Sequence, residues 1–208
     1  MIKELKKCIC ALLTVVMVLS SSLGIQAAEK QVQLQDCAEK LHITITEIID
    51  FKENLYAAFD EFNKSVPDDD TDLTIIKISE NLYLQVETVP EMDNSMRSTN
   101  ITLRNSAKVK NALGQTLITL TAVGTFNISG QTVKPISVYG LYDSTLYSVD
   151  SSETHLGTTG TVADATVIYK CVFNVGVGDW VIPFFSANIS GTLYCDYNGN
   201  PESTWSGI

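Results

Sequence analysis

The sequence predicts a mainly β fold, an antiparallel β-sandwich or barrel that follows an N-terminal amphipathic helical segment. Apolar and polar residues alternate through most of residues 100–208, glycine and asparagine recur between the alternating runs, and a helical period occurs only in the N-terminal part. The predicted organisation is a signal peptide at 1–28, an acidic helical segment at 29–66, an acidic linker at 67–72 and a β-sandwich domain at 73–208.

The first residues have the pattern of a cleavable export signal. They comprise a basic start, an apolar run and a region of small residues, namely Lys3, Lys6 and Lys7, then Cys8 to Leu19, then Ala27 and Ala28. As a helix, the apolar run would span about 18 Å, which is short of the ~30 Å hydrocarbon core. We therefore expect cleavage after Ala27 or Ala28, a secreted, extracellular chain, and no stable membrane insertion after the signal is removed.

The chain is acidic, with a formal net charge of −10. Removal of residues 1–28 takes away three bases and one acid and changes the charge to −12. Most of the acidic residues precede residue 97. A protein with this charge repels nucleic acid and anionic lipid, so neither is an expected partner.

Residues 45–64 have the pattern of an amphipathic helix. Large apolar residues recur at steps of three and four and therefore share one helix face: Ile48, Phe51, Leu55, Phe59 and Phe62. Thr44 and Glu47 have the spacing of a capping box, in which each side chain accepts a hydrogen bond from a backbone N–H. Residues 29–41 fit a shorter helix or the start of the same one, and residues 42–46 also alternate like a strand. The apolar face suits either packing on the sandwich or binding of a partner.

Leu73 to Ser79 and Leu82 to Val89 are predicted to form a β-hairpin that turns at Glu80 and Asn81. Further strands are predicted at 116–128, 159–173 and 186–197, with glycine-containing turns between strands. Their expected inward residues are Ile118, Leu120, Ala122, Gly124, Phe126 and Ile128, then Ala163, Ala165, Val167, Tyr169, Cys171 and Phe173, then Ala187, Ile189, Gly191, Leu193, Cys195 and Tyr197.

Three segments carry a resemblance to known sequences. Residues 108–117 are KVKNALGQTL, residues 124–130 are GTFNISG and residues 193–200 are LYCDYNGN. Over about residues 100–200, the chain resembles uncharacterised secreted β-rich proteins of Gram-positive bacteria. The resemblance implies export and a β-rich C-terminal region, and it implies no particular activity.

Cys171 and Cys195 both occupy inward positions of predicted strands. Because an exported protein meets an oxidising environment, we expect a disulfide between them, which would stabilise the fold by roughly 3 kcal/mol. The alternative is two buried thiols that pack as small apolar side chains. Cys37, in the acidic helical segment, is expected to be free or to link two copies of the chain.

The sequence contains no recognisable catalytic motif. It lacks G-x-S-x-G, G-x-x-x-x-G-K and H-E-x-x-H, and its only histidines are His42 and His155. His155 is predicted to lie in an exposed loop. On a helix, Cys37 and His42 would point about 140° apart, so they would not form a nucleophile and base. We therefore expect no catalytic residues and no cofactor.

Two acidic stretches partly match a calcium-binding loop: Asp68, Asp70 and Asp72, and then Asp196, Asn198, Asn200 and Glu202. Leu73 occupies the position where the first stretch would need glycine, and Pro201 does so in the second. We interpret them as a charged linker and a hairpin turn, and expect no metal.

Aromatic residues near the predicted turns are the remaining candidates for a binding site: Tyr139, Tyr142, Tyr147 and Trp180, together with Asp179. Exposed rings beside polar side chains can stack on the faces of sugars. The competing interpretation is that the core simply needs large side chains. The expected function is a secreted non-enzymatic interaction module whose partner is a cell-envelope glycan or another exported protein. The alternatives are a self-assembling extracellular matrix protein and a carboxylate-dependent hydrolase.

Overall fold

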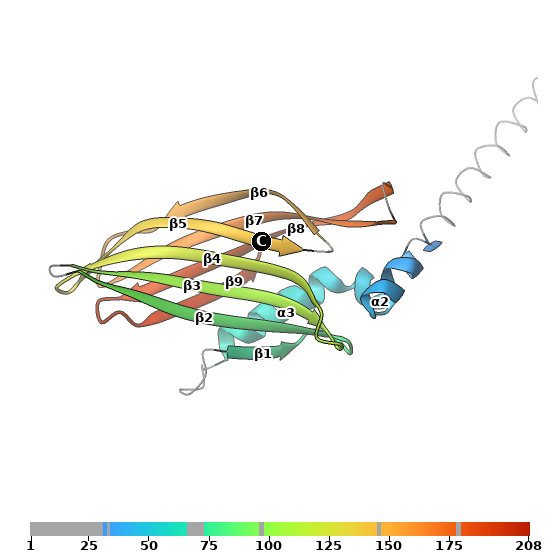
Figure 1. Ribbon diagram of the computed structural model, residues 1–208, viewed down its shortest axis with the longest axis horizontal. Coiled ribbons are helices and arrows are strands. Elements are labelled where there is room, and N and C mark those ends of the chain that lie inside the picture. Colours follow the sequence, from blue (N-terminus) through green and yellow to red (C-terminus); the bar gives the residue numbers. More distant parts are fainter. Residues whose placement is uncertain (1–30, 33, 66–72, 96–97, 145–146, 178–179) are drawn as a thin grey trace, which may run out of the picture.

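The computed structural model describes residues 31–208 except residues 33, 66–72, 96–97, 145–146 and 178–179. It is an antiparallel β-sandwich with short helices before the strands, which confirms the predicted fold class (Figure 1). Each sheet follows the order of the chain. The first sheet contains β1 (Leu73–Lys77), β2 (Leu82–Ser95), β3 (Ser98–Asn111), β4 (Thr116–Ser129) and β5 (Thr132–Ser144). The second contains β6 (Tyr147–Leu156), β7 (Val162–Val177), β8 (Trp180–Asp196) and β9 (Pro201–Gly207).

The strands have the alternation that their sequences predict. The expected inward residues of β4, β7 and β8 are buried wherever their side chains are described, with two exceptions. Ile128 is only partly buried, and Tyr197 is 41% exposed because β8 ends at Asp196 and Tyr197 lies in the turn that follows. The predicted hairpin is also confirmed, because β1 pairs with β2 in antiparallel register from Leu73 opposite Glu87 to Lys77 opposite Tyr83.

The helical prediction for residues 45–64 is confirmed, with a break at Asp50. α2 covers Ile45–Ile49 and α3 covers Phe51–Lys64. The capping box of Thr44 and Glu47 is present at the start of α2. Residues 34–41 form a separate helix that ends at His42, whose φ of 53° lies in the left-handed region. The strand-like alternation of residues 42–46 is therefore not realised.

The two long sides of the sandwich are closed differently. On one side β5 lies against β6 and β7. There Val133 and Gly160 form a two-way bridge, with N···O distances of 2.7 and 3.0 Å. On the other side α3 contacts both β1 and β9, the outermost strands of the two sheets (Figure 1). The helix therefore fills the gap that the sheets leave open.

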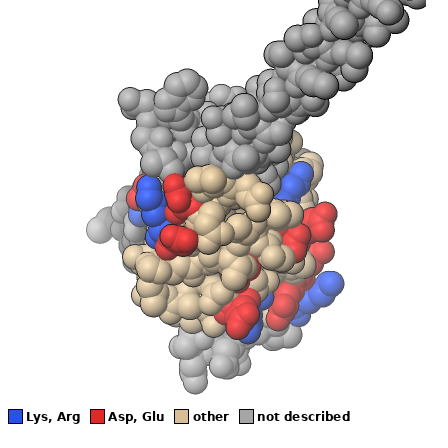
Figure 2. All heavy atoms as spheres, turned by 90° about the vertical axis from the view of Figure 1, so that its right-hand side faces the viewer, with Lys and Arg blue, Asp and Glu red and all other residues tan. Residues whose placement is uncertain are grey.

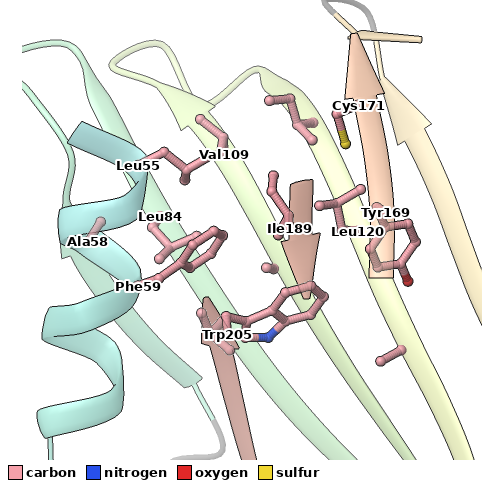
Figure 3. Close-up of a cluster of buried hydrophobic side chains, with 14 of the residues drawn as sticks. Leu55, Ala58, Phe59, Leu84, Val109, Leu120, Tyr169, Cys171, Ile189 and Trp205 are labelled. Atoms are coloured by element: carbon pink, nitrogen blue, oxygen red, sulfur yellow. The ribbon is translucent and has the colours of Figure 1, made fainter. Parts of the chain in front are cut away.

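The apolar face of α3 joins the same core as the strands. Phe59 stacks against Trp205 of β9 with ring centroids 6.0 Å apart, and Tyr169 of β7 stacks near the same indole at 6.3 Å. Figure 3 shows Phe59 reaching from the helix toward Trp205, with Leu84 and Ile189 close by. Of the two uses considered for this helix face, the structure realises packing on the sandwich.

A polar cluster lies within this core. Asn105 is fully buried, and its Nδ2 donates to the hydroxyls of Thr88 at 2.7 Å and Ser203 at 2.8 Å. The Nε1–H of Trp205 donates to Oδ1 of Asn105. The amide thus has partners for both of its donors and its acceptor, so its burial carries no desolvation penalty from an unmade bond.

The expected disulfide is not formed, because Cys171 and Cys195 are free thiols. The strand register explains why. Cys171 lies opposite Ala187 in the middle of the strand pair, whereas Cys195 lies opposite Ala163 near one end of the same pair. Eight residues along β8 separate Ala187 from Cys195, a distance of about 26 Å, far beyond the ~7 Å between Cα atoms that a disulfide tolerates. Both thiols are buried, as the alternative interpretation required, and Cys37 is also free.

None of the helices in the described part of the chain is both long enough and apolar enough to cross a membrane.

Candidate binding face on the first sheet

The two described candidate tyrosines lie on opposite faces of β5. Tyr139 is opposite Val123 of β4, and Tyr142 is opposite Leu120, whose side chain belongs to the core. Side chains alternate along a strand, so an odd separation of three places the two rings on different faces. Tyr139 is 47% exposed on the outer face of the first sheet, and Tyr142 is 55% exposed at the margin of its inner face.

Tyr139 belongs to a row that crosses the outer face of the first sheet. The register places Arg104 of β3, Val123 of β4 and Tyr139 of β5 side by side. Val123 is only 1% exposed although it is not part of the core between the sheets. Its burial therefore comes from its longer neighbours on the outer face. Arg104 and Tyr139 are themselves exposed.

Polar side chains form cross-strand pairs around this row. Thr102 and Thr125 lie 3.2 Å apart, and Ser106 and Thr121 lie 2.9 Å apart, measured between hydroxyl oxygens. Nδ2 of Asn127 donates to Oδ1 of Asn100 at 2.8 Å. All three pairs join β3 to β4 on the face that carries Tyr139. Pairs of this kind hold hydroxyl and amide groups in fixed positions on the face of a sheet, although Ser106 and Thr121 are themselves buried.

The remaining candidate residues belong to the second sheet or lie outside the described residues. Tyr147 is the first residue of β6, opposite Phe173, and Trp180 is the first residue of β8, opposite Val177. The side chains of Tyr147 and Trp180 and the whole of Asp179 lie outside the described part of the structure. Among the five candidates, Tyr139 alone has a described position on the outer face of the first sheet.

The histidines are both exposed. His155 lies in β6, opposite Thr166, and not in the predicted loop. The loop prediction was wrong because it rested on the polar run around His155, although an outward-facing edge strand has the same composition. His42 follows the helix at 34–41.

Three carboxylates are held ionised by hydrogen bonds. Burial acts to raise the pKa of Glu47, but bonds from Ser79, Thr44 and Asn81 outweigh it and lower the pKa to about 2. At Asp196, the effect of burial is likewise exceeded by bonds from Asn200 and Asn198, and the pKa is lowered. A hydrogen bond from Lys170 lowers the pKa of Glu153. At neutral pH these groups are weak proton acceptors.

The possible calcium ligands fall into two classes. Asp68, Asp70 and Asp72 lie outside the described residues. In the turn after β8, Asp196 accepts hydrogen bonds from the backbone N–H groups of Asn198 and Asn200 at 2.9 and 2.8 Å, and Gly199 has a φ of +86°. These are features of a tight hairpin turn. Within the described ranges, no three His, Cys, Asp or Glu side chains come together to form a metal site.

The sequence interpretation missed Arg104, Asn105 and Trp205. The alternation of β3 is enough to place Arg104 on the outward face, between the inward residues Leu103 and Asn105. Its position beside Val123 depends on the register with β4, which the sequence does not reveal. Asn105 occupies an inward position that patterning reserves for apolar residues. No signal in the sequence pairs Asn105 with Trp205, because they are 100 residues apart.

No protein-family model, curated protein or solved structure matches the chain.

Proposed function

We propose that the chain is an exported, non-catalytic module that binds polysaccharide through the outer face of its first sheet. The observation that carries the proposal is the exposed ring of Tyr139 on the same sheet face as ordered hydroxyl and amide pairs. A phenol ring offers an apolar face to the C–H groups of a sugar, and the surrounding polar groups replace water around its hydroxyls. The N-terminal pattern of residues 1–28 supports export.

Three acidic groups have pKa shifts opposite to the shift of a catalytic acid. Carboxylate hydrolases need one carboxyl that keeps its proton near neutral pH. Glu47, Glu153 and Asp196 are shifted in the opposite direction. The carboxylate of Glu47 also links α2 to the β1–β2 turn. It accepts hydrogen bonds of 2.6 Å from the hydroxyl of Ser79 and 2.8 Å from the backbone N–H of Asn81.

Co-sedimentation of the chain from Glu29 onward with isolated Gram-positive cell walls and insoluble polysaccharides tests the proposal. We expect saturable binding that Tyr139→Ala weakens at least tenfold. Tyr142→Ala is the matched control, because it removes an equally exposed ring from the other face of the same strand. Equal losses in both variants, or no binding to any of these materials, would contradict the proposal.

A second candidate function, self-assembly, is favoured by β1. This strand is the edge of the first sheet, it has only five residues, and it exposes Leu73 and Ile75 at 41% and 62%. Exposed apolar residues on an edge strand favour addition of another strand. Sedimentation velocity over a hundredfold range of concentration distinguishes the two candidates. Oligomers that Ile75→Lys abolishes would support assembly, and a monomer at all concentrations would exclude it.

A further inference from the structure

The basic residues of the β domain concentrate on one surface. Within β1 to β5, the outward positions of the first sheet hold five basic residues: Lys77, Arg104, Lys108, Lys110 and Lys134. The chain as a whole has a net charge of −10. We call these five residues the basic face.

Three members of the basic face lie on β3, the middle strand of the first sheet. Arg104, Lys108 and Lys110 occupy alternate positions of that strand, with Ser106 between them. Arg104 and Lys110 are therefore about 20 Å apart along the strand. Lys110 has Tyr83 of β2 beside it, and Lys77 of β1 lies beyond Tyr83 in the same row. Lys77, Tyr83 and Lys110 thus form one row across β1 to β3. The bases of β3 continue from Lys110 to Arg104, whose own row leads through Val123 to Tyr139.

Most of these charges have no ion-pair partner among the residues that the structure describes. Lys108 forms an ion pair with Glu87, with an Nζ···Oε2 distance of 3.0 Å. Lys77, Arg104, Lys110 and Lys134 form no ion pair with another described residue. Acidic residues on the same face are Glu87 and Asp143, and the register adds Glu91 and Asp93 at the end of β2 that lies farthest from Lys77 and Lys110.

The second sheet has the opposite balance. Its outward positions carry Glu153, Asp164 and Glu202 against a single described base, Lys170, which is paired with Glu153. The end of the molecule in Figure 2 shows acidic and basic side chains mixed around the rim, with uncharged atoms across the middle. Within the described β domain, the bases that form no ion pair therefore lie on the outer face of the first sheet.

We infer that the ligand of the first sheet is an acidic sugar polymer, a chain of sugars that carries carboxylate or phosphate groups. This inference rests on the proposed function and specifies its ligand class. Cations gathered on one face, most of them without an ion-pair partner among the described residues, attract an anionic polymer and hold it along β3. The hydroxyl and amide pairs and the two tyrosines suit the sugar units between its charges. The overall negative charge of the protein sets a limit on nonspecific adsorption, so binding requires this face.

A second copy of the chain is the competing occupant, since its acidic helical segment also complements the basic face. The net charge of −10 makes two copies repel each other before they dock. The same net charge also repels an acidic polymer, but a single extended polymer can lie along β3 alone, and salt screens its repulsion from charges more than about 8 Å away. The polymer is therefore the occupant that the charge distribution favours.

The test compares one sugar backbone in two charge states. Binding of the chain from Glu29 onward to polygalacturonate and to its methyl ester is measured by titration calorimetry, with a glycerol-phosphate polymer as a third ligand to separate carboxylate from phosphate sources. The test variant is Arg104→Gln with Lys110→Gln. The control is Lys52→Gln with Lys64→Gln, which removes the same charge from α3.

We expect at least one of the two acidic polymers to bind tenfold or more tightly than the methyl ester. The Arg104 and Lys110 variant removes that preference and the control variant keeps it, while Tyr139→Ala weakens binding to the acidic polymer and to the ester alike. Equal binding of acid and ester that still depends on Tyr139 would overturn the inference and leave the proposed function standing. Binding to none of these polymers, together with failure of the co-sedimentation, would remove both. If binding of the acidic polymer is unaffected by Tyr139→Ala, the face acts only by ion exchange, and the inference is overturned. If the chain forms a dimer that the Arg104 and Lys110 variant abolishes, the face binds a second copy, and the inference is likewise overturned.

Discussion

The side chain of Asn63 pairs with both backbone groups of Trp205, although the two residues are 142 positions apart. Its Nδ2 donates to the carbonyl of Trp205 at 2.7 Å, and its Oδ1 accepts from the backbone N–H at 3.1 Å. Trp205 lies on β9, the edge of the second sheet, where a neighbouring strand would otherwise make these bonds. The amide at the end of α3 thus takes the place of a strand residue and covers part of an edge that would be open to strand addition.

Asn63→Ala is expected to lower the free energy of unfolding by about 1–2 kcal/mol, because two hydrogen bonds are lost and water replaces them only partly. Urea unfolding should show a lower midpoint at an unchanged slope. Asp60→Ala, an exposed change on the same helix, serves as the control. If both variants shift the midpoint equally, the pairing with Trp205 contributes nothing measurable.

Glu47 is expected to make the stability depend on pH in the acid range. Its pKa is lowered from 4.5 to about 2 in the folded chain, so its contribution is complete above pH 4.5 and is lost as the pH falls toward 2. Glu47→Gln should cost about 1–3 kcal/mol at neutral pH. It should also flatten the fall in unfolding free energy between about pH 5 and pH 2. Glu53→Gln, exposed on α3, should leave that slope intact, and an unchanged slope in Glu47→Gln would rule out the assignment.

Gly191 provides the space for the indole of Trp205. A Cβ atom at this position would lie 2.8 Å from ring atoms Cη2 and Cζ3. Gly191→Ala should therefore destabilise the fold by about 1–3 kcal/mol through overpacking. The cost should shrink in a Trp205→Phe background, since the smaller ring leaves room for the methyl group. A full double-mutant cycle measures this coupling, and identical costs in the two backgrounds would show that the ring does not set the limit.

The buried thiols are expected to be inert in the native state. Burial raises the pKa of Cys171 to about 11, and burial together with Asp196 raises the pKa of Cys195 to about 11. Because the thiolate is the reactive form, neither should react with a thiol reagent at pH 8 until the protein unfolds. A double variant, Cys171→Ser with Cys195→Ser, should lose the labelling that these two thiols contribute when the protein unfolds. A mass that rises by two hydrogens on reduction of the unlabelled monomer would instead reveal a disulfide.

Local patterns predicted the elements that depend on local physics. The spacing of Thr44 and Glu47 locates the start of α2, and the apolar face from Ile48 to Phe62 identifies the buried side of both helices, whereas the break at Asp50 was not predicted. Alternation likewise identified the inward side of β4, β7 and β8. These properties are determined within a few residues of the chain, which is why sequence patterns were sufficient.

Properties set by register were not accessible in the same way. Matching inward positions suggested a bond between Cys171 and Cys195, yet face and position along the strand are independent, and only the pairing of Cys171 with Ala187 reveals the separation. The same limit applies to the candidate site. Proximity in sequence grouped Tyr139 with Tyr142, whereas pairing with Val123 and Leu120 assigns them to opposite faces. Arg104 became visible as a neighbour of Tyr139 only through two successive strand pairings.

The stack between Phe59 and Trp205 also has a consequence for biosynthesis. A ribosome completes α3 well over a hundred residues before it reaches β9. Throughout that interval the apolar face of the helix lacks its contact with Trp205. Contacts between such distant segments slow folding, because the entropy cost of closing a long loop comes before the contacts contribute any stabilisation. Until β9 is made, the core around Trp205 cannot be completed. An incompletely folded chain is the form that a protein-conducting channel accepts, so late completion of the core would suit the export that we propose.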